Sequence, residues 1–246
     1  SQVARVGRFP IMVTWFSWKG QEPSSKLTVT QSQNIVQEVG QRQMGSQNLV
    51  RVGSAVSGII MFEIILLGLM GSNNSAREIA GERQIMEKEK YGGVSTMSYL
   101  ASKAVFLGVM VAVQSLWMYA FVEFFWPFRG ELTTHLCFLL LANAAMTSVC
   151  LGISSVARTP DQASLLSIYL VGFQLPLSGA VLALPESIEI FVRPFISAYW
   201  SWSGSLSALD PYVYNAVKSV IDTSLTSANI CYSVLGLHIL VGLVLT

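Results

Sequence analysis

Charged side chains are scarce in this sequence. They make up 12% of the 246 residues, about half of the share in an ordinary soluble domain, while 52% of the residues are hydrophobic. The mean hydropathy is +0.53 and the formal net charge only +1, so the chain lacks the basic field that nucleic-acid binding needs. The composition predicts an integral membrane protein with no nucleic-acid partner.

Motifs for catalysis, metal binding and nucleotide binding are also missing. No GxxxxGK[ST] segment is present, so this chain cannot hold nucleotide phosphates in the P-loop manner. Cys137, Cys150 and Cys231 have no paired spacing, and His135 and His238 have no HExxH frame, so we expect all five to fill helix-packing or interfacial positions. The sequence therefore predicts no catalytic site and no metal site in this chain. Whether the chain is part of a larger enzyme stays open.

Long apolar runs, by contrast, recur along the chain. Crossing the hydrocarbon core takes about 20 apolar residues in a helix. Runs near 54–74, 98–122, 133–156 and 162–184 meet that length, and a fifth covers 229–246. Because spanning segments must satisfy their own backbone groups, these runs predict an all-α integral membrane protein, a polytopic helical bundle.

The first 51 residues differ from the rest. Only about ten apolar residues lie between Arg8 and Lys19, too few to cross a bilayer, so this stretch is either the end of an earlier span or an interfacial segment. A polar, glutamine-rich stretch follows and is expected outside the cell. We therefore separate an N-terminal segment, 1–51, partly extracytoplasmic, from a membrane domain, 52–246.

A charged helix is predicted at 75–91, between the first two runs. Ser75 and Glu78 have capping-box spacing, in which the serine hydroxyl accepts from the amide of Glu78, and two glycines after Tyr91 favour a helix end. Arg83 and Glu87 have the i,i+4 spacing of an ion pair. Lys and Arg near this loop place it in the cytoplasm. It is either a surface helix lying on the membrane or a docking element, since interleaved charges favour a protein partner over anionic lipid.

Three segments resemble one family. AREIAGERQIMEKEKYGGVSTMSYLASK, residues 76–103, resembles the cytoplasmic loop of permease domains in G-like ABC exporters, the type-2 ABC transporter permease class. RTPDQASLL, 158–166, is similar to that family's short cytoplasmic turn. LPLSGAVLALPESIEIFVRPFISAYWSWSGSLSAL, 175–209, is similar to its fifth span and external re-entrant helix. The likeness covers residues 54–246 in order.

The resemblance implies a domain of about six spans, with 75–91 as the coupling helix that an ATPase domain pushes. That ATPase domain, separate or fused, would bind ATP and Mg²⁺, and this chain would hold no cofactor. The other partners implied are a second permease copy, as homo- or heterodimer, and membrane lipid, in a bacterial inner membrane or its eukaryotic equivalent. The residues expected to couple to the ATPase are Arg77, Glu78, Glu82, Arg83, Glu87 and Lys88.

Two further sets of side chains are candidate functional residues. Glu63 lies inside an apolar run, where a carboxylate costs about 2.5–3.5 kcal/mol, so it either lines the translocation path or bonds to a neighbouring helix for packing. The external loop, 185–228, has too few uncharged residues to span and is rich in aromatics. It either gates the exit or anchors the bundle at the interface. The gate residues would be Phe191, Phe195, Tyr199 and Trp200.

Together these features predict the permease subunit of an ATP-driven exporter for a lipid-like or other hydrophobic cargo. The alternative is a permease-derived scaffold that transports nothing and anchors a larger assembly through the same charged helix.

Overall fold

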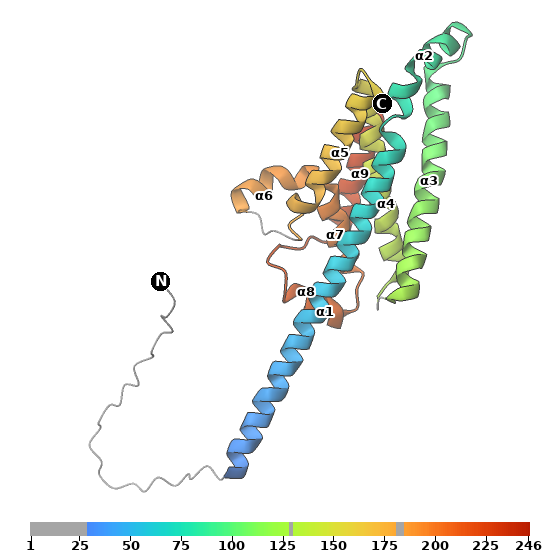
Figure 1. The fold of residues 1–246 in the computed structure, drawn as a ribbon. Helices are drawn as coiled ribbons and strands as arrows, with labels where there is room; N and C mark the ends of the chain where they lie inside the picture. The colour runs from blue at the N-terminus through green and yellow to red at the C-terminus, as the bar shows by residue number, and fades with distance from the viewer. Residues whose placement is uncertain (1–28, 128–129, 181–184) are drawn as a thin grey trace. The chain divides into compact units, whose positions relative to one another are not determined.

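The described part of the chain is helical (Figure 1). The structure is a computed structural model that describes residues 29–127, 130–180 and 185–246; of residues 29–44, 46 and 186 it describes the backbone alone. The elements in chain order are α1 (Val29–Ser75), α2 (Glu78–Tyr91), α3 (Thr96–Phe125), α4 (Leu132–Val156), α5 (Pro160–Leu177), α6 (Glu186–Val192), the 3₁₀ turn η1 (Arg193–Phe195), α7 (Ser197–Ser207), α8 (Pro211–Lys218) and α9 (Ala228–Leu245). This confirms the predicted all-α class.

Within these described ranges, four helical stretches are long and apolar enough to cross a membrane. They are the stretch Gln47–Tyr91, which contains the apolar part of α1, and the helices α3, α4 and α9. The helix α5 has 18 residues, as many as α9, but Asp161 and Gln162 in its first turn lower its hydropathy. Its predicted run continues to residue 184, and 181–184 lie outside the described residues. The result is a polytopic helical membrane bundle.

The N-terminal segment is only partly covered. Residues 1–28, with the short apolar stretch before Lys19, lie outside the described residues. From Val29 onward the glutamine-rich stretch belongs to α1, which therefore begins well before the apolar run predicted near residue 54. Residues Ser46–Thr246 form one compact unit.

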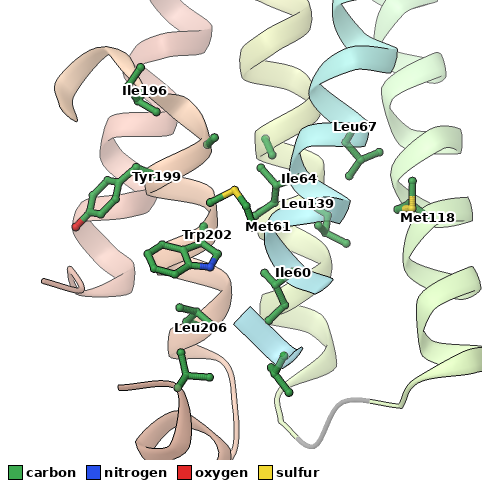
Figure 2. Close-up of a cluster of buried hydrophobic side chains, with 14 residues drawn as sticks. Ile60, Met61, Ile64, Leu67, Met118, Leu139, Ile196, Tyr199, Trp202 and Leu206 are labelled. Carbon is green, nitrogen blue, oxygen red and sulfur yellow. The ribbon is translucent and has the colours of Figure 1, made fainter. Parts of the chain in front are cut away.

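A buried hydrophobic cluster in this unit joins α1 to α7 (Figure 2). Trp202 is fully buried and its indole N–H donates to the carbonyl oxygen of Ser57 at 3.3 Å. Large aromatic side chains contribute much of the buried apolar area of a core. Thus α7, which lies in the segment predicted as external loop, is part of the bundle core. The labelled members are Ile60, Met61, Ile64 and Leu67 on α1, Met118 on α3, Leu139 on α4, and Ile196, Tyr199, Trp202 and Leu206 on or just before α7.

Glycines bring α4 and α9 into backbone contact. A Cβ atom added at Gly242 would lie 2.4 Å from the carbonyl carbon of Ser148, and one at Gly152 would lie 2.9 Å from the carbonyl oxygen of Gly242. Small residues allow such close approach between membrane helices, where tight packing replaces the hydrophobic effect as the driving force. The helices α4 and α9 are therefore closely fitted to each other at these glycines.

Candidate functional site

The charged helix α2 lies between the end of α1 and the beginning of α3 (Figure 1). The predicted capping box is wrong. Ser75 is the last residue of α1, and its hydroxyl donates to the carbonyl oxygen of Gly71 at 2.7 Å. The N-cap of α2 is Arg77, with no side-chain cap hydrogen bond. The predicted end is confirmed: α2 stops at Tyr91, and Gly93 adopts a φ of 90°.

A serine on α4 supplies the cap that α2 lacks locally. The first amides of a helix have no partner within it. The Ser154 hydroxyl oxygen accepts from the amides of Ile79 at 3.1 Å and Ala80 at 3.0 Å. Because Ser154 is fully buried, this hydrogen bonding fixes the beginning of α2 against the end of α4.

The second attachment to α4 is Arg83. Instead of pairing with Glu87 as predicted, its guanidinium donates to the carbonyl oxygens of Ser155 at 2.7 Å and Ala157 at 2.9 Å. These carbonyls end α4 and have no partner within the helix, and a cation there also opposes the negative end of the helix dipole. Arg83 thus joins the middle of α2 to the end of α4.

Tyr99 and Lys103, which no sequence motif marks as candidates, attach α2 to α3. The ammonium of Lys103 lies 2.8 Å from Glu78 Oε2 and 2.7 Å from Glu82 Oε2. The Tyr99 hydroxyl donates to Glu82 Oε2 at 3.0 Å. The hydrogen bond from Lys103 holds the pKa of the Glu82 carboxyl, on α2 beyond the apolar part of α1, below its ordinary value. The sequence contains one indication of this contact: Glu78 and Glu82 on α2 have the same i,i+4 spacing as Tyr99 and Lys103 on α3.

The link to α5 is weaker. Arg77 Nε donates to the Ser164 hydroxyl at 2.6 Å, and its guanidinium lies 3.7 Å from Asp161 Oδ1. The side chains of Arg77 and Asp161 are 64% and 87% exposed, so solvent screens the ion pair and its stabilising effect is small.

The six residues predicted to couple to an ATPase therefore divide into two groups. Arg77, Glu78, Glu82 and Arg83 contact α3, α4 or α5 of this same chain. Glu87 and Lys88 are exposed, as are Ile85 and Tyr91 on the same part of α2. We refer to Ile85, Glu87, Lys88 and Tyr91 as the α2 tip. The tip belongs to the exposed C-terminal part of α2, which also contains Gln84, Glu89 and Lys90.

Glu63 lies in the bundle interior with 1% of its side chain exposed. Its Oε2 is 3.1 Å from Nε2 of His135 on α4, an ion pair when the imidazole is protonated and a hydrogen bond otherwise. Among the described residues its other oxygen, Oε1, has no hydrogen-bond partner. The ring of Tyr119 on α3 stands 6.1 Å from that of His135. The contact that the packing alternative requires is present, and a role in the translocation path stays a prediction.

A groove runs along a face of α1 that does not include Glu63. Its volume is about 480 Å³, and α1 residues from Ser54 to Leu69 line it together with Leu175 and 220–223. Most of the lining is apolar, with Asp222 and Thr223 among the few polar side chains. A second space, of about 380 Å³, shares Leu69 and continues between the end of α1 and α5. Glu63 lines neither of them.

The predicted gate residues also divide. Phe191 and Phe195 are 76% and 74% exposed. Tyr199 is buried and its hydroxyl hydrogen-bonds to Ser224 and Thr226, while the Trp200 indole donates to the carbonyl oxygen of Arg193 at 2.9 Å. The segment, expected as a re-entrant or interfacial helix, is divided into two helices, α6 and α7, by the turn η1 at Pro194. Whether it gates an exit stays a prediction.

Comparison with known proteins places this architecture in a family. The model of the ABC-2 type transporter family matches residues 12–207, beginning ahead of residue 52, where we placed the start of the membrane domain. An ABC transporter ATP-binding/permease protein of Mycobacterium tuberculosis (strain ATCC 25618 / H37Rv) is 27% identical over 150 residues, which cover 57% of this chain and 17% of that relative. From the family match and the apolar spanning helices, the chain belongs to the ABC-2 type transporter family, as a membrane permease domain.

Proposed function

We propose that this permease domain is the membrane half of an ATP-driven exporter, in which an ATPase domain acts on the α2 tip. The observation that carries the proposal is the division of α2. Its first half is attached to α3, α4 and α5, whereas Glu87, Lys88 and Tyr91 face solvent. A helix held in this way can pass a displacement of its free end to three neighbours, as two-state transitions between packed helices require.

The Lys and Arg residues near α2 favour the cytoplasm as its location, where ATP is available. The ATPase domain, fused or separate, would hold ATP and Mg²⁺. Two such permease domains would work as a dimer, in a bacterial inner membrane or the eukaryotic equivalent.

The groove on α1 supports a hydrophobic, lipid-like cargo. Its lining is mostly apolar, and binding pockets combine an apolar wall with a few polar groups that fix orientation. Asp222 and Thr223 could orient the head group of an amphiphile whose apolar part lies along α1.

The experiment uses the complete transporter in liposomes and reverses the charges of the tip with Glu87→Lys and Lys88→Glu. We expect insertion and folding to persist and cargo-stimulated ATP hydrolysis to be lost, because the ATPase no longer docks. Glu87→Asp with Lys88→Arg keeps both charges and serves as the matched control. Full stimulation in the reversed variant would contradict the proposal, and docking without any transport in the native protein would favour the scaffold alternative.

A further inference from the structure

The connection between α2 and α3 is a short, glycine-containing turn. Gly92 and Gly93 follow α2, Gly93 has a φ of 90°, and α3 begins at Thr96. Glycine at such a turn leaves the backbone free to adopt other conformations. Near the turn Tyr91 and Met97 are 94% and 77% exposed, so apolar packing does not fix the angle between the two helices at this end. Another contact must determine that angle.

Lys103 provides such a contact. Its ammonium lies between two carboxylates of α2, 2.8 Å from Glu78 Oε2 and 2.7 Å from Glu82 Oε2. The side chains of Lys103 and Glu78 are 18% and 22% exposed, so solvent screens this ion pair less than it screens a surface ion pair. The side chain of Glu82 is 40% exposed, so solvent screens its ion pair with Lys103 more strongly.

The spacing of the two carboxylates makes Lys103 more than one bond among several. Glu78 and Glu82 stand four residues apart on one face of α2, where like charges repel. With Lys103 between them, both are attracted to α3. Without it, two adjacent negative charges would face α3, and the Tyr99 hydroxyl alone would hold Glu82.

We propose that Lys103 is a positioning residue for energy coupling: by holding Glu78 and Glu82 it fixes α2 to α3, so that a displacement of the α2 tip moves α3 as well. This inference rests on the proposed function. Lys103 acts through the two glutamates and has no part in docking, because its contacts lie on the face of α2 toward α3 and away from the tip.

The test compares variants of the complete transporter, with its ATPase, in liposomes. For Lys103→Met we expect the ATPase to remain bound while cargo-stimulated ATP hydrolysis falls about fivefold or more, the size of a typical allosteric coupling. Lys103→Arg keeps the charge between the carboxylates and should restore stimulation. Glu78→Gln with Glu82→Gln in the Lys103→Met background removes the repulsion and should restore part of it.

A spectroscopic measurement separates positioning from a general structural role. Spin labels at Gln84, on α2 outside the tip, and at Met97, both exposed, report the distance between α2 and α3. We expect a wider distance distribution in Lys103→Met than in the native protein or in Lys103→Arg, with unchanged melting of the bundle. The inference is overturned if Lys103→Met shows normal stimulation of ATP hydrolysis and an unchanged distance distribution, provided that tip reversal still abolishes stimulation. If tip reversal has no effect either, the proposed function fails with it.

Discussion

Replacing His135 by leucine tests whether the contact with Glu63 holds a carboxylate inside the bundle. Glu63 is 1% exposed, Oε2 contacts His135, and Oε1 has no hydrogen-bond partner among the described residues. His135→Leu therefore leaves a buried carboxylate without its imidazole. Breaking a buried pair by removing one partner costs about 3–5 kcal/mol. At about 2–4 °C per kcal/mol for a chain of this size, the melting temperature should fall by about 6–20 °C.

The double variant Glu63→Leu/His135→Leu is the decisive comparison. Replacing both members of a buried pair by apolar residues is often neutral or stabilising, so it should melt at or above the temperature of the native protein. Thermal unfolding in nanodiscs, monitored by tryptophan fluorescence, measures the melting temperatures of the single and the double variant. If His135→Leu alone melts within about 2 °C of native, or the double variant is less stable than either single one, the reasoning fails. If the double variant is stable and transports as the native protein does, Glu63 serves packing alone. If it is stable but transport is lost, the result supports a position of Glu63 in the translocation path.

The remaining predictions concern packing, the α2–α4 link and topology. Gly242→Ala should destabilise the bundle by about 1–3 kcal/mol, because the new Cβ meets the backbone of α4. A Cβ at Gly236 on the same helix meets nothing within 4 Å, so Gly236→Ala should melt at the temperature of the native protein. Equal melting temperatures of the two variants would contradict the close packing of α4 and α9. Arg83→Ala loses two hydrogen bonds to carbonyls at the end of α4, so the free energy of unfolding should fall by about 1–2 kcal/mol and α2 should become more sensitive to limited proteolysis. Arg83→Lys should be intermediate. Unchanged proteolysis of Arg83→Ala would argue against the link between α2 and α4. In a cysteine-free background, cysteines at Ser187 and Tyr91 should be labelled from opposite sides of the membrane, and labelling from one side would contradict the orientation.

Much of the fold is readable from the sequence because its main signal is local. Each spanning helix that the structure contains corresponds to an apolar run long enough to cross a bilayer. The end of α2 is local too, since it depends on the glycines that follow Tyr91. The beginning of α2 is not predictable in the same way, because Ser75 and Glu78 have capping-box spacing whether or not the preceding helix continues. Here α1 continues, and the Ser75 hydroxyl bonds back to Gly71.

The partners of the candidate residues were harder to predict because they are distant in sequence. Arg83 has a plausible neighbour in Glu87 four residues on, yet it bonds to carbonyls more than seventy residues away, which offer unsatisfied acceptors at the end of α4. The sequence predicts only a helix-packing or interfacial position for His135, and the fold shows that it contacts Glu63. The sequence marks Lys103 only as one of the basic residues near the charged loop, although its spacing from Tyr99 matches that of the two glutamates it contacts.

The glycine contact between α4 and α9 bears on how such a domain can change shape. With backbone touching backbone at Gly242 and Ser148, neither helix can slide along the other without steric overlap, and no side chain is available to change rotamer and make room. We therefore expect the pair to move as one body, and α4 is also the helix that receives Arg83 and supplies Ser154 and His135. During a transport cycle we expect α1, α2, α3 and α5 to change position relative to this pair. Distances measured from α4 would then report that motion directly, whereas distances between α1 and α5 would mix two movements.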